Sequence, residues 1–344
     1  MDPAMMASGS PTRLGRYVLH EALGVGGMAT VYRGELQAIA GFRRAVAVKV
    51  LHPHLRTDPK VVRGFLREAR LAARLRHTNV VPVLDVGEVP EGVFLVMELC
   101  DGVTLGELLA ASAGGTRAAL GLHALTEALA GLHEAHELRG DDGASLGLVH
   151  RDFTVNNILA DRRGAVRLAD FGIARTSRGP IVTTQPVVKG TLPYLAPEQV
   201  RGAELDRRTD VFAAGSVAFE VLTGRPLQDP AAEPTLTLAR IAAGEHASTR
   251  ELAPGAPDAL HDAIEWALRL DPAERCPDAD ALRRAILDAT GPSATGRAAV
   301  AAAVERALEA QQSDGAGPAA ATRGPAARAS VPESGQTPPR RTRV

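Results

Sequence analysis

A change of pattern near residue 105 is the feature that most constrains the fold of this chain. Before it, from about residue 15 to 99, short Val-rich runs alternate with Gly-containing turns, which is typical of an antiparallel sheet. The expected strands cover residues 17–23, 30–35, 45–51, 80–86 and 93–99, with one helix over 60–76. After it, apolar residues recur at helical spacing over 105–111, 118–137, 209–222, 235–243 and 257–270, with short strands near Ile158 and Val166. The pattern predicts an α+β protein with a small β-rich lobe and a larger, mainly α-helical lobe.

The length of the chain also favours two lobes, because 344 residues exceed the usual size of a single hydrophobic core. We expect a flexible leader over 1–14 and a folded domain over 15–290, with its lobes at 15–100 and 101–290. Beyond residue 291 the composition shifts to Ala, Gly, Pro, Arg and Ser. A helix is expected over 295–312 and disorder elsewhere in this tail. The basic ending is compatible with a partner for the tail, although a solvated tail without one is the simpler interpretation.

Charge and cysteine content exclude several classes of protein. Lys and Arg number 39 against 40 Asp and Glu, which gives no electrostatic reason to expect nucleic acid as a partner. The two cysteines, Cys100 and Cys276, lie far apart and favour a reduced compartment over a disulfide framework. No run of about 18 apolar residues occurs, so we expect no membrane span and a cytoplasmic location.

A glycine-rich turn lies between the first two long strands, in residues 23–32 (LGVGGMATVY). A dinucleotide fold needs such glycines to open a helix, whereas a flexible hairpin can lie over a triphosphate and offer backbone N–H groups. The candidate contacts are Leu23, Gly24, Gly26 and Gly27. The third glycine of the usual pattern is replaced by Ala29, and a plain hairpin turn is the alternative interpretation of this segment taken alone.

A lysine and a glutamate occupy positions where the pattern expects apolar residues. Strand alternation places Lys49 on the same face as Ala47, where an unpaired ammonium would be costly. On the following helix Glu68 shares a face with Phe65 and Ala72, an unusual position for a carboxylate without a cation. We therefore expect Lys49 and Glu68 to pair, the alternative being that Lys49 reaches solvent and Glu68 lies at a helix edge.

The strongest signal is the run at residues 150–159 (HRDFTVNNIL), followed by Asp170 in Ala-Asp-Phe-Gly. Asp152 and Asn157 lie on one short loop, and Asp170 follows a short strand. These three oxygen-bearing side chains are of the kind that binds hard cations and a hydroxyl nucleophile. Chance agreement of all three spacings is improbable.

With these motifs in this order, the sequence resembles the eukaryotic-like protein kinase family, in particular its bacterial serine/threonine members, over about residues 15–290. Residues 190–198 (GTLPYLAPE) look like the substrate-facing loop of the family and its anchor, whose Glu198 is expected to pair with Arg275. Asp210 matches the aspartate that opens the central helix and steadies the catalytic loop.

The resemblance implies ATP and Mg²⁺ as cofactors and assigns a role to each site residue. Lys49, oriented by Glu68, would contact the α- and β-phosphates, Asn157 and Asp170 would hold the metal, and Asp152 would meet the substrate hydroxyl. Adenine is expected between the lobes. Its expected neighbours are Val31, Ala47 and Leu159, with Met97, Glu98 and Cys100 as the hinge.

The sequence departs from the family at Thr154, where most serine/threonine members carry a lysine that helps to neutralise the γ-phosphate. Loss of such a contact is worth a few kcal/mol, roughly ten- to a thousandfold in rate. It also weakens the sequence argument for Ser/Thr over Tyr as the acceptor. Arg151 is expected to bind a phosphate on the activation segment. Thr183 and Thr184 are preferred to Thr176 and Ser177 as autophosphorylation sites.

Three classes of function remain open at the level of sequence. An active kinase of protein substrates is favoured, because Lys49, Asp152, Asn157 and Asp170 are all present. A catalytically weak pseudokinase scaffold is the alternative that Thr154 leaves open. A small-molecule kinase would be unlikely to need the loop at 190–198. Dimerisation is compatible with the sequence but not indicated by it.

Overall fold

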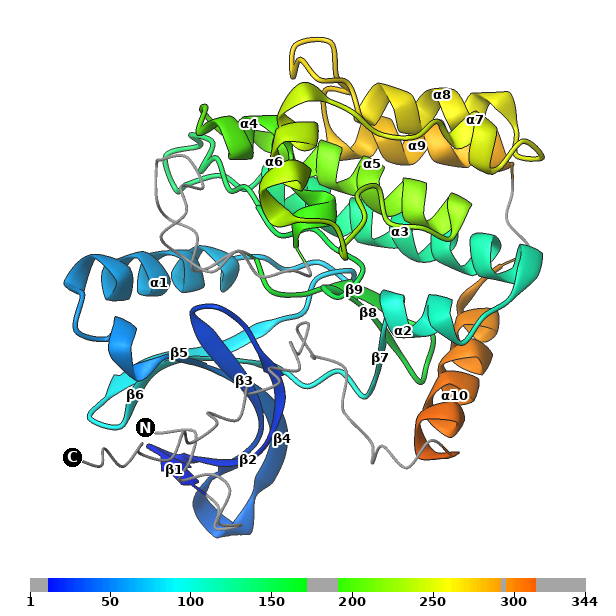
Figure 1. Cartoon of the computed structure of the whole chain (residues 1–344). Coiled ribbons are helices and arrows are strands. Elements are labelled where there is room, and N and C mark those ends of the chain that lie inside the picture. Colours follow the sequence, from blue (N-terminus) through cyan, green and yellow to red (C-terminus); the bar gives the residue numbers. More distant parts are fainter. Residues whose placement is uncertain (1–11, 172–190, 292–294, 314–344) are drawn as a thin grey trace, which may run out of the picture.

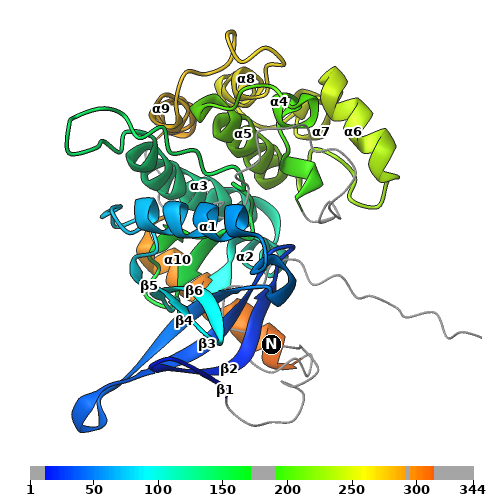
Figure 2. The ribbon, with the colours of Figure 1, turned by 90° about the vertical axis from the view of Figure 1, so that its left-hand side faces the viewer.

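The computed structural model describes residues 12–171, 191–291 and 295–313. Figures 1 and 2 show two stacked lobes, one built around a curled sheet and the other mainly of helices, with α1 at their junction. The sheet is antiparallel, with the order β1-β2-β3-β4-β6-β5. Its strands are β1 (Thr12–Leu14), β2 (Tyr17–Val25), β3 (Ala29–Gln37), β4 (Arg43–Leu51), β5 (Val83–Val89) and β6 (Gly92–Glu98). The predicted two-lobe α+β fold is confirmed.

Helix α1 (Pro59–Ala72) forms because the chain supplies both a cap and an apolar face. The Asp58 side chain accepts a hydrogen bond from Lys60 N at 2.8 Å, and Pro59 occupies the first helical position. Phe65 and Ala69 are buried on one face. The helix ends one turn earlier than the expected 60–76, because Leu75 N bonds to Ala72 O in a tight turn that still buries the Leu75 side chain.

The strand expected over 80–86 begins three residues later, at Val83. Val80 and Val81 pair instead with the other lobe, through a bridge from Val80 to Leu168 and a bond from Val81 N to Leu168 O at 2.9 Å. Pro82 lies between the two pairings. Residues of this apolar run therefore pair with strands of both sheets and connect the two lobes at this point.

The second lobe surrounds α5 (Arg207–Thr223), which is buried along most of its length. Helices α3 (Gly114–His136), α8 (Asp258–Ala267) and α9 (Ala279–Thr290) pack around it. A small sheet of order β7-β8-β9 faces the first lobe. The remaining elements are β7 (Gly102–Thr104), β8 (Ile158–Asp161), β9 (Val166–Leu168), α2 (Leu105–Ala110), α4 (Pro197–Arg201), α6 (Pro234–Ala243), α7 (Thr249–Leu252), and the 3₁₀ helices η2 (Ile39–Gly41), η3 (Pro53–Leu55) and η4 (Leu192–Tyr194).

The helix expected over 295–312 is present as α10 (Arg297–Ser313), which packs on α2, β7 and β8. One apolar cluster runs through both lobes and includes the buried face of α10, while a second lies on the other face of the large sheet. Within the three described ranges, no helix combines the length and apolar character needed to cross a membrane.

Candidate active site

Lys49 and Asp170, which come from different lobes, meet at the centre of the molecule. Lys49 lies mid-strand in β4, between Val31 of β3 and Leu95 of β6. Its Nζ is 3.1 Å from Asp170 Oδ1, and the two side chains are only 14% and 19% exposed. At this burial each charge compensates the desolvation of the other. The structure thus joins residues 121 positions apart in sequence, as 170 − 49 shows.

Glu68 does not form the expected ion pair with Lys49. Its ion-pair contact among the described residues is with Arg151 Nη1, at 4.0 Å from Glu68 Oε1. Glu68 Oε2 is buried and accepts no hydrogen bond. In this structure the Lys49 ammonium contacts Asp170, and Glu68 faces the Arg151 guanidinium. Burial raises the pKa of Glu68 to about 7, against the attraction of Arg151, Arg67 and Lys49.

The raised pKa of Glu68 predicts that this residue makes stability depend on pH. Its folded-state pKa of about 7 lies above the ordinary 4.5, so between these values the folded protein binds more protons than the unfolded chain. The free energy of unfolding therefore falls as pH rises through this window, by about 1–2 kcal/mol for a side chain that keeps some solvent contact. In Glu68→Gln this part of the slope is expected to vanish in urea unfolding at pH 5 and pH 8. An unchanged slope in the variant would contradict the assignment, and Glu21→Gln on the exposed surface is the control.

The loop that carries His150, Arg151 and Asp152 is anchored by the buried carboxylate of Asp210 at the start of α5. It accepts bonds from His150 N at 2.6 Å and Arg151 N at 2.7 Å, and His136 Nε2 lies 2.8 Å from it. These contacts hold Arg151 in a left-handed conformation with φ of 62°, which is uncommon for a residue other than glycine. The steadying role expected for Asp210 is confirmed by this geometry.

His150 is a buried, structural member of the same loop. Its Nε2 donates to Ala169 O at 3.0 Å and its Nδ1 accepts from Asp152 N at 3.3 Å, which is the bonding pattern of a neutral imidazole. Burial lowers its pKa. The ring also packs on Phe171, with centroids 4.6 Å apart. His150 therefore links the loop that carries Asp152 to the strand end that carries Asp170.

Asn157 and Asp170 are brought together by the hairpin of β8 and β9. Ile158 pairs with Leu168 in this hairpin, and Ala169 N bonds to Asn157 O at 2.8 Å. Asn157 Nδ2 donates to Asp152 O at 2.7 Å and to Asp152 Oδ2 at 3.0 Å. Both bonds use the amide nitrogen and not the amide oxygen, which is the atom that could bind a cation. Asp152, Asn157 and Asp170 thus form one compact group.

The chemistry of this group fits Mg²⁺ with phosphate. Asn157 and Asp170 supply hard oxygen atoms, and Mg²⁺ is usually bound by one or two side chains together with phosphates and water. In the part of the chain that the structure describes, no three His, Cys, Asp or Glu side chains cluster as a metal site of their own.

The predicted adenine neighbours lie in one apolar cluster. Leu23, Val31, Ala47, Met97, Cys100 and Leu159 are all buried members of it. Ala47 and Met97 are opposite each other across β4 and β6, and Leu159 lies in β8 on the other lobe. Burial raises the pKa of the Cys100 thiol to about 12, so Cys100 behaves as a small apolar residue. The turn with Gly26 and Gly27 is closed by a bond from Gly26 N to Ala29 O at 2.9 Å.

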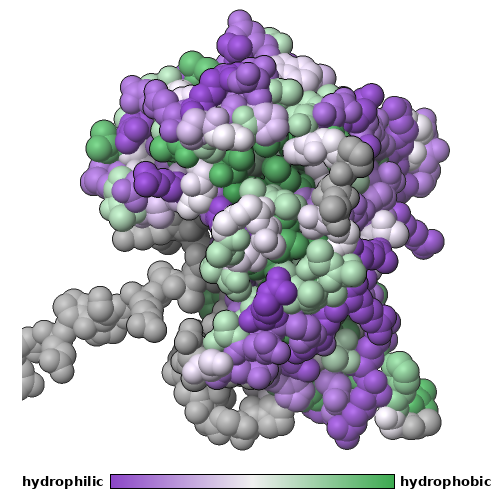
Figure 3. Space-filling model, turned by 90° about the vertical axis from the view of Figure 1, so that its right-hand side faces the viewer, coloured by the Kyte–Doolittle hydropathy of each residue, from purple (hydrophilic) through white to green (hydrophobic). Residues whose placement is uncertain are grey.

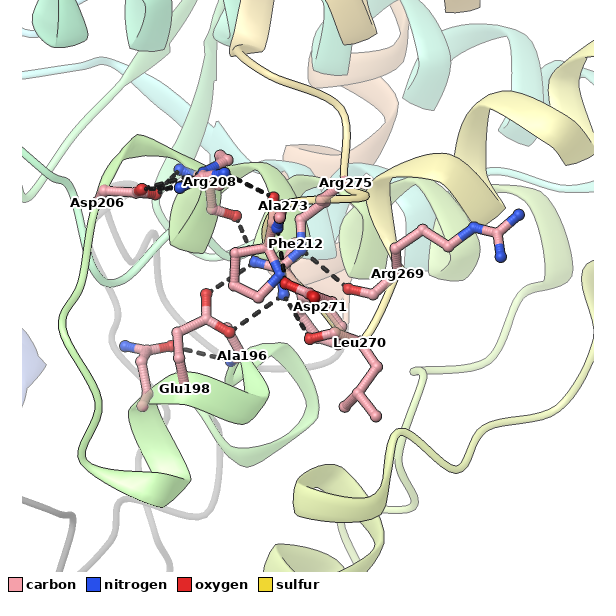
Figure 4. A network of polar contacts seen from close by, with 12 residues as sticks. Ala196, Glu198, Asp206, Arg208, Phe212, Arg269, Leu270, Asp271, Ala273 and Arg275 are labelled. Atoms are coloured by element: carbon pink, nitrogen blue, oxygen red, sulfur yellow. Dashed lines mark hydrogen bonds and ion pairs between the residues drawn. The ribbon is translucent and has the colours of Figure 1, made fainter.

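Figure 4 shows the ion pair of Glu198 and Arg275 at the start of α4, which follows the segment expected to face the substrate. Arg275 donates to both carboxylate oxygens of Glu198, at 2.7 and 3.1 Å, and its side chain is fully buried. Further bonds run to Arg208 O and Arg269 O, and the guanidinium lies 5.0 Å from the centre of the Phe212 ring. The expected pairing of Arg275 with Glu198 is confirmed.

Several supporting residues were missed at the level of sequence. Tyr194 donates to Glu220 Oε2 at 2.6 Å, which connects the loop to α5. Gln199 Nε2 donates to Arg151 O at 3.4 Å, and His136 reaches Asp210 from α3. For Glu220 the signal available was a carboxylate in an otherwise apolar stretch of α5, whereas the polar sequence around His136 gave no such signal. Thr154 is buried and its Oγ1 accepts a bond from Asn156 N at 3.3 Å.

The phosphorylation sites expected at Thr183 and Thr184, and the less favoured Thr176 and Ser177, lie outside the described residues. Gly172 and Gly190 do as well. These assignments stay predictions.

The fold defines a two-lobed α+β protein with Lys49 and Asp170 in contact between its lobes. The sequence pattern of the family described as "Protein kinase domain" matches residues 17–285, and the chain belongs to that family. Known relatives include bacterial serine/threonine kinases, which confirms the predicted bacterial eukaryotic-like branch.

Two curated relatives illustrate the similarity. The chain is 37% identical over 277 residues to tyrosine-protein kinase MasK of Myxococcus xanthus, an alignment covering 79% of this chain and 42% of MasK. It is 34% identical over 261 residues to serine/threonine-protein kinase PrkC of Bacillus subtilis, covering 76% of this chain and 38% of PrkC. The matched part thus spans about two fifths of the length of these relatives.

Among solved structures, the kinase domain of PknI from Mycobacterium tuberculosis is similar, with a TM-score of 0.62 and 26% identity. The superposition covers 82% of this chain and 98% of that domain. The whole two-lobed architecture, rather than one lobe, is therefore shared.

Proposed function

We propose that the chain is an ATP- and Mg²⁺-dependent protein kinase that transfers the γ-phosphate to Ser or Thr hydroxyls of protein substrates. The observation that carries the proposal is the contact of Lys49 with Asp170 at 3.1 Å, beside Asp152 and Asn157. A cation for phosphate, oxygen ligands for a metal and a carboxylate for a hydroxyl proton are the parts that phosphoryl transfer needs.

In this mechanism the side chains mainly position groups and compensate charge. Lys49 would bind the α- and β-phosphates, and Asn157 and Asp170 would hold Mg²⁺, which would reduce the negative charge on the transferring group. Asp152 orients the acceptor hydroxyl and accepts its proton. The hydroxyl oxygen bonds to the γ-phosphorus as the bond to the β–γ bridging oxygen breaks, and ADP leaves.

The pairing of Glu68 with Arg151 supports a proposal for regulation. A phosphate on the activation segment would compete with Glu68 for Arg151, because a dianion binds a guanidinium more strongly than a half-buried carboxylate does. Glu68 would then be released to pair with Lys49. Autophosphorylation at Thr183 or Thr184 is the proposed source of that phosphate.

The comparisons and the site favour an active enzyme over the pseudokinase scaffold. A scaffold that had lost catalysis would be expected to lack at least one of four groups, and all of them are present and close together: Lys49, Asp152, Asn157 and Asp170. The anchored loop at Glu198 favours a protein over a small-molecule acceptor, since it supports a surface for an extended substrate. The proposal is compatible with a cytoplasmic location, with a partner for the tail and with dimerisation, but it does not depend on any of them.

The test is a phosphotransfer assay with purified protein, Mg·ATP and a generic basic protein, beside Asp170→Ala. We expect phosphate on Ser and Thr of the substrate, with transfer reduced by about 10²-fold or more in the variant because a metal ligand is lost. Phosphoamino-acid analysis separates Ser/Thr from Tyr, and mass spectrometry maps the phosphates on the kinase itself. Equal labelling by both proteins, or phosphate on Tyr alone, would contradict the proposal.

A further inference from the structure

Helix α10 lies outside the residues matched by the kinase family, yet it is packed into the same core. The family match ends at residue 285, and α10 covers Arg297–Ser313. Its buried residues are Val300, Ala303, Val304, Ala307 and Leu308, and all five belong to the apolar cluster that includes the predicted adenine neighbours. In Figure 1 α10 lies beside α2 and β7, and Figure 3 views the face on which it lies, where weakly hydrophobic residues are bordered by hydrophilic ones.

Arg162, in the turn between β8 and β9, connects α10 to the segment that follows the hinge. Its Nη1 is 2.6 Å from Glu305 Oε2 of α10, and its Nε is 3.3 Å from Asp101 Oδ2. The Arg162 backbone N also donates to Asp101 O at 3.0 Å. One residue therefore joins α10, the β8–β9 turn and the chain next to Cys100.

Two close backbone approaches make this connection stiff. Gly164 has φ of 75°, and a Cβ built there would lie 1.9 Å from Arg297 O at the start of α10. A Cβ on Gly102 in β7 would lie 1.9 Å from Ala160 O in β8. Because glycine has no side chain at these two points, α10, the turn, β7 and β8 lie in direct backbone contact. We therefore expect them to move as one unit.

This unit carries part of the proposed nucleotide site. Leu159 in β8 is opposite Thr104 of β7, and Cys100 lies two residues before β7. Both Leu159 and Cys100 are predicted to contact adenine. A shift of β7 or β8 would move both together, although α10 itself contributes none of the predicted contacts.

We propose that α10 is a positioning element for the adenine subsite: by packing on β7 and β8 it sets the places of Leu159 and Cys100 and so raises the affinity for ATP. The inference rests on the proposed function, since it needs a nucleotide site at this position. It adds a segment beyond the family match to the machinery that binds ATP, through packing rather than direct contact.

The test compares Val304→Ala in α10 with Val221→Ala near the end of α5, both in the full chain. The two valines are fully buried and lose the same two methyl groups, but Val221 packs near Gly121 of α3 instead of on β7 or β8. We measure the Kd of a fluorescent Mg·ATP analogue, the KM for ATP, kcat and Tm. Val304→Ala is expected to raise Kd and the KM for ATP about three- to tenfold with kcat within about twofold, whereas Val221→Ala lowers Tm and leaves Kd unchanged.

Glu305→Arg is the second variant, chosen because position 305 is partly exposed and the fold tolerates change there. Repulsion from Arg162 is expected to raise Kd in the same direction but less, about twofold. An unchanged Kd in both α10 variants, with Tm lowered in Val304→Ala, would overturn the inference and leave α10 a packing element only. Absence of nucleotide binding by the unaltered protein would instead contradict the proposed function, so the two failures are distinguishable.

Discussion

Replacing Asp152 with asparagine is expected to lower kcat by about 10²- to 10⁴-fold while the affinity for Mg·ATP stays nearly unchanged. The amide has almost the shape of the carboxylate but cannot accept the proton of the acceptor hydroxyl. The bond from Asn157 Nδ2 to the backbone oxygen of residue 152, at 2.7 Å, does not depend on the side chain, so the loop should keep its conformation. Single-turnover phosphotransfer and titration with a fluorescent ATP analogue measure the two quantities separately.

Asp141→Asn is the matched control for this variant. Asp141 is 93% exposed and pairs with Arg74 at 2.6 Å, far from the proposed chemistry. The same isosteric change there should leave kcat within about twofold. If Asp152→Asn also kept kcat within that range, Asp152 would not be the group that accepts the proton.

The second large effect is expected on stability, when the pair of Glu198 and Arg275 is broken. Arg275→Met leaves a buried carboxylate without its cation, and Glu198→Gln leaves a fully buried guanidinium without its anion. Removal of one partner of a buried ion pair lowers the free energy of unfolding by about 3–5 kcal/mol. In the double variant the decrease should be smaller than the sum of the decreases in the two single variants. Urea unfolding measures these values, and a fall in Tm of about 10 °C should accompany each single change.

An exposed pair supplies the comparison for this experiment. Arg250 pairs with Asp258 and Asp262 on the surface, where its side chain is 42% exposed. Arg250→Met should lower the free energy of unfolding much less than Arg275→Met does, because solvent screens the exposed pair and can replace it. Equal costs for Arg275→Met and Arg250→Met would show that the buried pair does not fix the substrate-facing loop.

The parts of the site that could be predicted from sequence are those whose geometry follows from spacing along one hairpin or one strand. Asn157 and Asp170 flank β8 and β9, so pairing of these short strands is enough to bring them together. Lys49 lies mid-strand, and its charge in an apolar run required a carboxylate nearby. The identity of that carboxylate did not follow, because sequence shows which charges face the core but not which of two cations, Lys49 or Arg151, a given acid will meet.

Errors in the predicted fold have a similar origin. Val80 and Val81 have the composition of a strand, yet they bond to Leu168 in the other lobe, a contact that no local pattern contains. The surface on which α10 packs could not be predicted either, because an alanine-rich helix has no sharply apolar face to indicate its partner. His136 was missed because its single bond to Asp210 joins two helices distant in sequence. In each case the structure depends on a contact between segments that are distant in sequence, and hydrophobic periodicity carries no information about such contacts.

The left-handed backbone at Arg151, and the same conformation at Asp170 with φ of 55°, has a consequence for evolution and for engineering. Each such residue costs about 1 kcal/mol or more relative to an unstrained one, and glycine would remove that cost. Glycine would also delete the guanidinium or the carboxylate. At Asp170 the same change would also leave the buried Lys49 ammonium without its carboxylate, a loss of about 3–5 kcal/mol that exceeds the strain relieved, so selection for folding alone would keep the residue that the proposed chemistry needs.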